Sequence, residues 1–116
     1  MNEANDTAVA VDAAQMSELH DMASHACDLL KAMANEWRLM ILCQLAESEK
    51  TVSELQSLLG LGQSALSQHL AILRREKIVV SRKHAQSVSY SLAGDEATRV
   101  MESLHDVFCG AVDSRE

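Results

Sequence analysis

Hydrophobic residues recur at spacings of three and four in two stretches, one near each end of the chain. The first stretch runs from about Met16 to Met33, and its spacing predicts an amphipathic helix. A second such helix is predicted to begin at about Asp95, with an apolar stripe formed by Val100, Met101, Leu104, Val107, Phe108 and Ala111. Each end of the folded chain is therefore expected to be a helix with one apolar face.

Further helices are expected between these two. Asn35 is a residue type that caps helix N-termini, and the helix that follows it is predicted over 36–47. Thr51 and Glu54 have the spacing of a capping box, so a short helix should start there. The segment "GLGQ" then turns the chain, because glycine accepts a positive φ without strain. A longer helix over 63–76 completes a helix-turn-helix.

The segment "IVVSRKHAQSVSYSL" changes the hydrophobic period to two, which is typical of strands. Alternation on both sides of Ala85 predicts a β-hairpin, and Arg82 and Lys83 lie on its first strand. A helix-turn-helix followed by a basic hairpin is the winged form of this motif. The predicted fold class is therefore mainly α with a β-hairpin wing, a winged helix-turn-helix with about five helices.

Composition indicates a single small domain. The chain has 116 residues, of which 47% are hydrophobic and none is proline. Residues 1–13 are small and polar without a helical stripe, so they are expected to form a disordered tail before a folded domain over 14–116. No apolar run approaches the ~20 residues that span a bilayer, and the N-terminus lacks the pattern of a secretory signal. A cytoplasmic protein without membrane contact is expected.

The distribution of charge is more informative than the net charge of −7. Residues 1–50 carry nine acids and three bases, and residues 93–116 carry six acids and two bases. Residues 51–92, by contrast, have two acids and five bases. A basic centre between acidic flanks is compatible with one surface that faces the phosphates of a nucleic acid.

The helix predicted over 63–76 has two distinct faces. Leu66, Leu70 and Leu73 form an inward face, and Arg74 and Arg75 lie at the far end, where they are placed for phosphates. The outward face consists of short polar or small residues, which allow a helix to lie deep in a major groove and reach base edges: Gln63, Ser64, Ser67, Gln68 and Ala71. The alternative is an ordinary solvated surface.

Two segments together resemble the ArsR/SmtB family of winged-helix repressors over about residues 29–92. They are "LKAMANEWRLMILCQL" and "TVSELQSLLGLGQSALSQHLAILRREKIVVSRKHAQSVSYSL", in which "SALSQHLAIL" is the most specific part. The resemblance implies a homodimer through the first and last helices that binds double-stranded operator DNA. His69 belongs to this motif but neighbours the face of Leu66 and Leu70, so it is expected to be a packed, hydrogen-bonded histidine rather than a base contact. The residues that the resemblance implies to contact DNA are Gln63, Ser64, Ser67 and Gln68 at bases, and Arg82 and Lys83 on the wing.

The chain departs from the family pattern at two turns. Lys77 stands where the family usually has the glycine that ends the helix predicted over 63–76, which is the recognition helix of the family. Ala85 stands where the tip of the wing often has a glycine. Neither substitution removes a DNA contact. The conformation of the wing is the feature that they put in question.

The three cysteines form no CxxC pair, so they are expected to be thiols rather than a disulfide framework or zinc site. Cys43 and Cys109 resemble the pair in a dithiol subgroup of the family, that of BigR and SqrR. This resemblance implies a sensor of reactive sulfur species, such as persulfides, in which a disulfide or polysulfide bridge releases DNA and derepresses sulfide-detoxification genes. Cys27 lies outside the pair and is expected to be buried.

Other interpretations of the cysteines remain open. By its helical position Cys43 also fits a small buried hydrophobe, whereas Cys109 lies off the apolar stripe and should be accessible. The same pair would serve a peroxide or general thiol-redox repressor. Metal sensing is less favoured, because the short helix has no cysteine and the last helix has only His105 as a histidine.

Two further classes of protein are alternatives. A protein-binding winged helix without operator DNA would show weak, salt-insensitive association with DNA. An enzyme is least favoured, because the sequence contains no paired carboxylates, no nucleophile with a base and no phosphate-cradling loop. No cofactor is expected.

Overall fold

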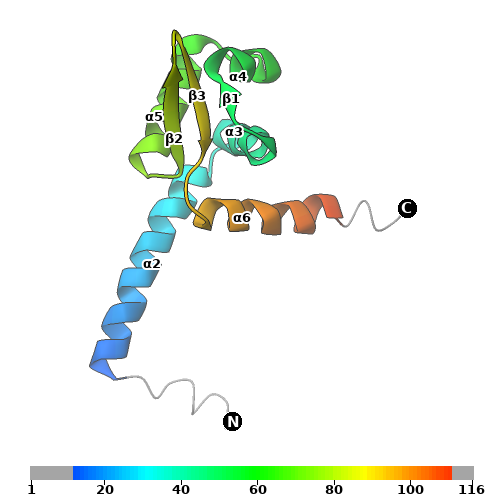
Figure 1. The fold of residues 1–116 in the computed structure, drawn as a ribbon. Coiled ribbons are helices and arrows are strands. Elements are labelled where there is room, and N and C mark those ends of the chain that lie inside the picture. The colour runs from blue at the N-terminus through cyan, green and yellow to red at the C-terminus, as the bar shows by residue number, and fades with distance from the viewer. Residues whose placement is uncertain (1–11, 111–116) are drawn as a thin grey trace.

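A computed structural model describes residues 12–110 of the chain, and it has the predicted winged helix-turn-helix architecture (Figure 1). The helices are α2 (Ala13–Met33), α3 (Glu36–Glu47), α4 (Val52–Leu59), α5 (Gln63–Arg75) and α6 (Glu96–His105). A π-helical segment, η1 (Asp106–Gly110), continues α6. The strands are β1 (Lys50–Thr51), β2 (Val79–His84) and β3 (Ser87–Leu92).

The helix α2 begins three residues earlier than its apolar stripe predicts. Asp12 and Gln15 form a capping box, in which Asp12 Oδ1 accepts from the Gln15 amide at 2.8 Å and Gln15 Oε1 accepts from the Asp12 amide at 3.1 Å. These bonds satisfy N–H groups that the first turn leaves without partners. The tail predicted over 1–13 lies outside the described residues except for its last two positions.

The caps predicted for α3 and α4 are confirmed. Asn35 Oδ1 accepts from the Arg38 amide at 3.1 Å and starts α3. At the start of α4, Thr51 Oγ1 accepts from the Glu54 amide at 3.1 Å, and Glu54 Oε1 accepts from the Thr51 amide at 2.8 Å. Because these bonds join residues only three positions apart, the sequence alone identifies the first residue of α3 and of α4.

The predicted hairpin is formed by β2 and β3. Together with β1 it makes a three-stranded antiparallel sheet in the order β1-β3-β2. Strands β2 and β3 pair from Val79↔Leu92 to His84↔Ser87, around the predicted turn. Strand β1 was not predicted, because its two residues are too short to show a period. It pairs with β3 through Lys50↔Tyr90 and Thr51↔Ser89 and joins the root of the wing to the helices.

The core is aliphatic and centres on α3. This helix contacts α4, α5, α6 and β3, and its Leu42 side chain is fully buried. The inward face predicted for α5 is confirmed, because all three of its leucines are buried. The core residues contributed by α3 and α5 are Ile41, Leu42, Leu45, Leu66, Leu70 and Leu73. Their packing determines how α5 is presented on the surface.

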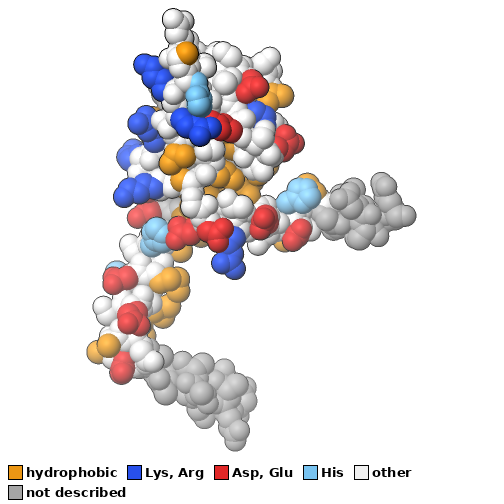
Figure 2. Space-filling view, in the orientation of Figure 1, with side chains coloured by type: hydrophobic (Ala, Val, Ile, Leu, Met, Phe, Trp, Pro, Cys, Tyr) orange, Lys and Arg blue, Asp and Glu red, His pale blue; other side chains and the backbone are white. Residues whose placement is uncertain are grey.

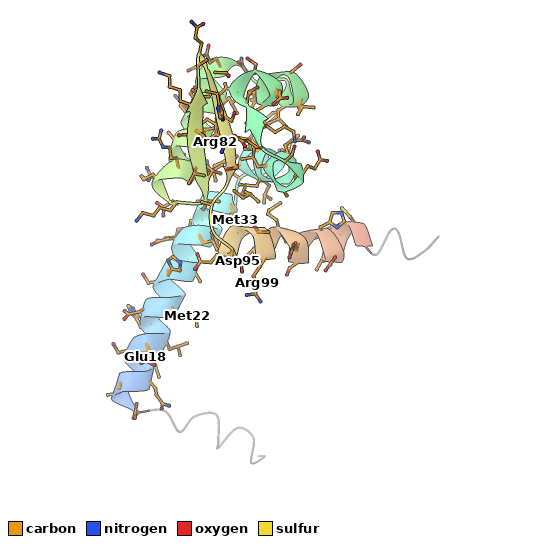
Figure 3. The ribbon with its side chains drawn as sticks, in the orientation of Figure 1. Glu18, Met22, Met33, Arg82, Asp95 and Arg99 are labelled. Atoms are coloured by element: carbon orange, nitrogen blue, oxygen red, sulfur yellow. The ribbon has the colours of Figure 1, made fainter. Side chains whose placement is uncertain are left out.

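The helices α2 and α6 project away from this core at a wide angle to one another (Figure 1). The radius of gyration is 18.3 Å, whereas a compact chain of this length would have about 13 Å. Apolar side chains are exposed on both helices, including Met22 on α2 and Phe108 on η1, which are 58% and 70% exposed. In Figure 3, Met22 lies on the projecting part of α2 and Met33 lies where α2 joins the body. Between residues 12 and 110, no helix has the length and hydropathy needed to cross a bilayer.

The two positions at which the sequence departs from the family pattern both have a positive φ. Lys77 has φ 62° and Ala85 has φ 53°, so both lie in the left-handed region that favours glycine. Lys77 lies two residues after the last residue of α5, and its amide donates to the carbonyl of Arg74 at 2.9 Å. The predicted turns therefore form despite the substitutions, at the expense of backbone strain.

Replacement of Lys77 by glycine should increase stability. Relief of left-handed strain outweighs the greater entropy of glycine in the unfolded chain, so we expect Lys77→Gly to raise the free energy of unfolding by about 0.5–1 kcal/mol. Urea denaturation measures this change. Lys77→Ala removes the same charge but keeps the Cβ atom, so it is the matched control and should give no such increase. Equal effects of glycine and alanine would contradict the assignment of strain to this residue.

Candidate DNA interface and thiol groove

The outer face of α5 presents short polar side chains to solvent. Gln63, Ser64, Ser67 and Gln68 are all exposed, on the side of the helix opposite its buried leucines. Amide and hydroxyl groups donate and accept hydrogen bonds at base edges, and their small size allows close approach. The structure thus leaves all four predicted base-reading residues accessible on one helix face.

Cations lie beside this face. Arg74 and Arg75 are exposed in the last turn of α5, and Lys83 is exposed on β2. Figure 2 shows Lys and Arg side chains along the edge of the body formed by α5 and β2, with acidic side chains on α2 and α6. This separation explains how a chain of net charge −7 can still present a basic surface.

Arg82 differs from the other wing cation because it is already paired. Its Nη2 donates to Glu49 Oε1 at 2.7 Å, and the side chain of Arg82 remains 64% exposed. Glu49 lies just before β1, so the pair links the wing to the loop that follows α3. No local pattern in the sequence predicts this contact, which joins residues 33 positions apart.

His69 lies on α5 but faces the body. It is half-buried, and its Nδ1 is 3.4 Å from Nη1 of Arg38 on α3. The guanidinium can only donate, so Nδ1 accepts and the ring proton lies on Nε2. Burial, and then the charge of Arg38, lower the pKa of His69. The histidine is therefore a neutral packing residue between α3 and α5, as the sequence predicted.

A groove of about 590 Å³ runs between α3 and the last helix, and we call it the thiol groove because both Cys43 and Cys109 line it. Cys43 comes from α3, and Cys109 comes from η1. Apolar side chains form much of its wall: Leu39, Ala46, Met101, Leu104 and Phe108. Two thiols that are 66 positions apart in sequence therefore share one surface cavity.

Cys43 is exposed rather than part of the core. The buried side of α3 consists of Ile41, Leu42 and Leu45, so the buried-hydrophobe interpretation of Cys43 is wrong. Partial burial raises the pKa of the Cys43 thiol, and the nearby Cys109 and Glu47 raise it further by charge repulsion. Cys109 is therefore close enough to Cys43 for an electrostatic interaction.

The π-helical segment explains how Cys109 reaches the groove. In a continuous α-helix, Cys109 would be rotated by about 80° from Met101, eight residues earlier. Hydrogen bonds from residue i to i+5 widen the turn in η1 and reduce this rotation. Cys109 then lines the same groove as Met101. The predicted accessibility of Cys109 is confirmed, but its place beside Cys43 needed the structure.

Cys27 is also exposed, so the expectation that it is buried in the first helix is wrong. It lies on α2 and does not line the thiol groove. The helix α2 projects from the body, and most of its side chains therefore face solvent. Cys27 provides an internal comparison, an accessible thiol without a thiol partner in the groove.

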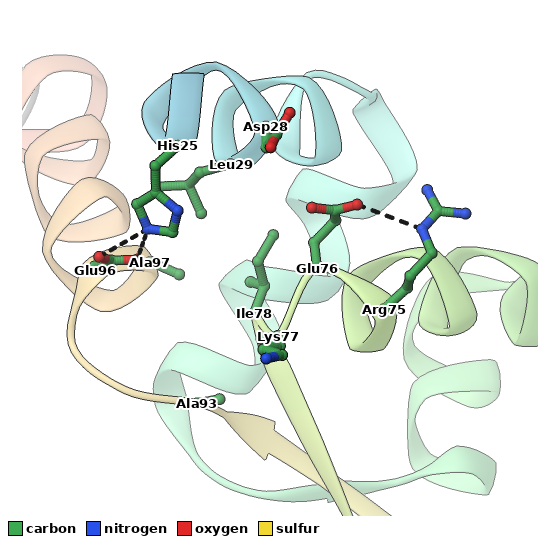
Figure 4. A pocket seen from close by; sticks show the side chains of 10 residues that line it. All are labelled: His25, Asp28, Leu29, Arg75, Glu76, Lys77, Ile78, Ala93, Glu96 and Ala97. Atoms are coloured by element: carbon green, nitrogen blue, oxygen red, sulfur yellow. Dashed lines mark hydrogen bonds and ion pairs between the residues drawn. The ribbon is translucent and has the colours of Figure 1, made fainter. Parts of the chain in front are cut away.

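A second hollow, of about 260 Å³, lies where α2 meets the end of α5 and the start of α6 (Figure 4). His25 Nε2 lies 3.0 Å from both carboxylate oxygens of Glu96, and Arg75 Nε lies 3.4 Å from Glu76 Oε2. His25 and Glu96 are largely exposed, so their ion pair adds little stability. Over residues 12–110, no group of three or more His, Cys, Asp or Glu side chains is placed to hold a metal ion.

Comparisons with known proteins agree with this geometry. A family model described as "Bacterial regulatory protein, arsR family" matches residues 35–81. The transcriptional activator HlyU of Vibrio cholerae is 51% identical over 96 residues, which span 83% of this chain and 89% of that protein. The structure of reduced HlyU from V. cholerae gives a TM-score of 0.77 at 52% identity, over 79% of this chain and 97% of that one. The structure of the transcriptional repressor BigR from Xylella fastidiosa gives a TM-score of 0.74 at 34% identity, over 81% of this chain and 96% of that one.

Removal of the Glu49 charge should strengthen DNA binding. Glu49→Gln frees Arg82 and removes an anion near the wing, so the affinity for duplex DNA at about 0.1 M salt should rise roughly threefold. Fluorescence anisotropy with a labelled duplex measures the effect. Glu18→Gln, on the distant half of α2, removes the same charge and should leave affinity unchanged (Figure 3). Equal affinities for wild type and Glu49→Gln would contradict a role for Arg82 at the DNA.

The raised pKa of Cys43 predicts slow alkylation. Its reaction with iodoacetamide should reach half its maximal rate above the pH of an ordinary cysteine, about 8.5. Peptide mapping against pH measures this midpoint. Cys109→Ser should lower the midpoint, because the repelling thiolate is removed, whereas Cys27→Ser should not change it. A midpoint that does not respond to Cys109→Ser would show that the two sulfurs do not interact.

Proposed function

The chain belongs to the bacterial ArsR family of transcriptional regulators, and on this basis we propose that it is a dimeric repressor controlled by the Cys43 and Cys109 thiols. Regulation of transcription by DNA binding follows from family membership. The finer proposal is that reactive sulfur species bridge the two thiols and release operator DNA. The observation that carries it is the thiol groove, in which both cysteines face one cavity.

The proposed DNA complex follows from the exposed face of α5. This helix enters the major groove with Gln63, Ser64, Ser67 and Gln68 toward the bases, while Arg74, Arg82 and Lys83 contact phosphates. The apolar faces of α2 and the last helix pack against those of a second copy, which covers side chains such as Met22 and Val107. A two-fold dimer then places two copies of α5 on successive half-sites of the operator.

The sensing reaction begins at Cys109. A raised pKa keeps Cys43 protonated at neutral pH, which leaves Cys109 as the first nucleophile. Its thiolate attacks the outer sulfur of a persulfide, RSSH, and the carrier leaves as the thiol RSH. Cys43 then loses its proton and attacks Cys109 Sγ, which expels hydrosulfide and leaves a Cys43–Cys109 disulfide. The two protein thiols are oxidised, and the persulfide sulfur is reduced to sulfide.

A longer bridge follows from a second persulfide molecule. If Cys43 is also converted to a persulfide, its terminal sulfur attacks Cys109 Sγ, expels hydrosulfide and leaves a trisulfide. This product relaxes the distance requirement, since a direct disulfide needs Cα atoms within about 7 Å. Both products tie η1 to α3.

The helix α3 would couple the Cys43–Cys109 bridge to DNA binding. One side of this helix packs against α5 and the other lines the thiol groove. A bridge from Cys43 to Cys109 would fix the last helix, which is part of the proposed dimer interface, against the support of α5. Bridged and reduced dimers would then differ in the spacing of their recognition helices, which is the differential binding that allostery requires. Release of the operator would derepress sulfide-detoxification genes.

Two features of the relatives support this proposal. One solved structure of a relative is described as the reduced form of HlyU, and another relative is the repressor BigR. The competing function is a general redox repressor, in which peroxide oxidises Cys109 to a sulfenic acid and Cys43 displaces water to form a disulfide. It uses the same two thiols, so only the choice of oxidant separates the two functions.

Intact mass analysis followed by peptide mapping tests the proposal. Reduced protein is treated briefly with glutathione persulfide and, separately, with hydrogen peroxide or glutathione disulfide. We expect a Cys43–Cys109 bridge, with or without added sulfur, after persulfide only, and retention of DNA binding when either cysteine is changed to serine. Cys27→Ser is the control and should behave as wild type. A disulfide with every oxidant would establish the general redox switch, and loss of DNA binding by persulfide-treated Cys109→Ser would refute the dithiol mechanism.

A further inference from the structure

The thiol groove has an acidic rim around its apolar wall. Glu47 on α3, Glu102 on α6 and Asp106 at the start of η1 all line it. Among the described residues that line the groove, His105 is the only base. Carboxylates therefore line the groove both on its α3 side and on the side of the last helix.

Little of this negative charge is neutralised nearby. Lys50 Nζ lies 3.7 Å from Glu47 Oε1, but the carboxylate side chain is 72% exposed and Lys50 Nζ also bonds to Ser48 Oγ at 2.9 Å. Within residues 12–110, neither Glu102 nor Asp106 takes part in a salt bridge. These two acids are four residues apart on the last helix, so they reinforce one another on one face. Glu47 is one cause of the raised pKa of the Cys43 thiol, so part of this charge acts on that thiol.

We propose that the thiol groove selects its sulfur donor by charge and polarity, and that its preferred substrate is an uncharged or cationic organic persulfide with an apolar substituent. This inference rests on the proposed sensing function. Carboxylates at the opening repel anionic donors and lower their local concentration. Leu39, Met101 and Phe108 offer apolar surface to the carrier, which leaves as its thiol after sulfur transfer to Cys109.

A matched pair of donors separates charge from sulfur chemistry. Glutathione persulfide has two free carboxylates and a net negative charge, whereas its diethyl ester has the same sulfur and backbone and a net charge that is two units more positive. At low ionic strength we expect the ester to form the Cys43–Cys109 bridge about tenfold faster, and the ratio to approach one at about 1 M salt, where charges a few ångströms apart are screened. Quenched samples analysed by intact mass give both rates.

Variants of the rim identify the source of the selectivity. The double variant Glu102→Gln and Asp106→Asn should bring the ratio of the two rates close to one, and Glu47→Gln alone should reduce it. Each ratio compares two donors on the same protein variant. A change in the thiolate fraction of the cysteines alters both rates by the same factor and therefore does not alter the ratio. Glu18→Gln lies far from the groove and should keep the wild-type ratio (Figure 3). A ratio near one in wild type at low salt, or one that the rim variants leave unchanged, would overturn the inference.

Failure of the sensing function is distinguishable from failure of this inference. If neither donor forms a bridge, the dithiol function is wrong, but alkylation still tests the selectivity. Iodoacetamide is neutral and iodoacetate is anionic, so Cys109 should favour iodoacetamide by a larger factor than Cys27 does, and the rim variants should remove the difference. Equal preferences at Cys109 and Cys27 would overturn the charge selectivity whether or not a bridge forms.

Discussion

The burial of one side of α3 is the constraint on which both candidate sites depend. Ile41, Leu42 and Leu45 pack into the aliphatic core with the leucines of α5, so contacts with α3 determine which face of α5 is left exposed. Because these residues occupy the inner side of the helix, Cys43 is left on the surface that faces the last helix. The recognition helix and the thiol groove are therefore two consequences of one packing arrangement, and a change on one side of α3 has a physical route to the other.

Charge divides the molecule in the same way. The edge formed by α5 and β2 is basic, whereas α2, α6 and the rim of the thiol groove are acidic (Figure 2). Phosphates are attracted to the first region and anions are repelled from the second. Two acids cross this division: Glu76 pairs with Arg75 at the end of α5, and Glu49 pairs with Arg82 on the wing strand β2. That pair reduces the free positive charge of the wing and so limits its attraction for any DNA.

Much of the fold was predictable because its signals are local. Asn35, Thr51 and Glu54 specify where two helices start, and the period of the leucines in α5 identifies its buried side. Features that depend on distant residues could not be predicted. Strand β1 exists only because Lys50 and Thr51 meet β3, and the exposure of Cys27 reflects the projection of α2. That Cys43 and Cys109 share one groove depends on the packing of α3 against the last helix and on the widened turn of η1, neither of which leaves a pattern in the sequence.

The central claim is that a bridge in the thiol groove changes the affinity of α5 for DNA. It is tested most directly by the dissociation constant for a duplex selected by the protein itself from a random library, measured for purified reduced and purified Cys43–Cys109 bridged protein at the same salt concentration. The bridged form should bind the duplex at least about tenfold more weakly, a typical size for allosteric coupling, and reduction should restore the original affinity. Equal affinities of the two forms would contradict it.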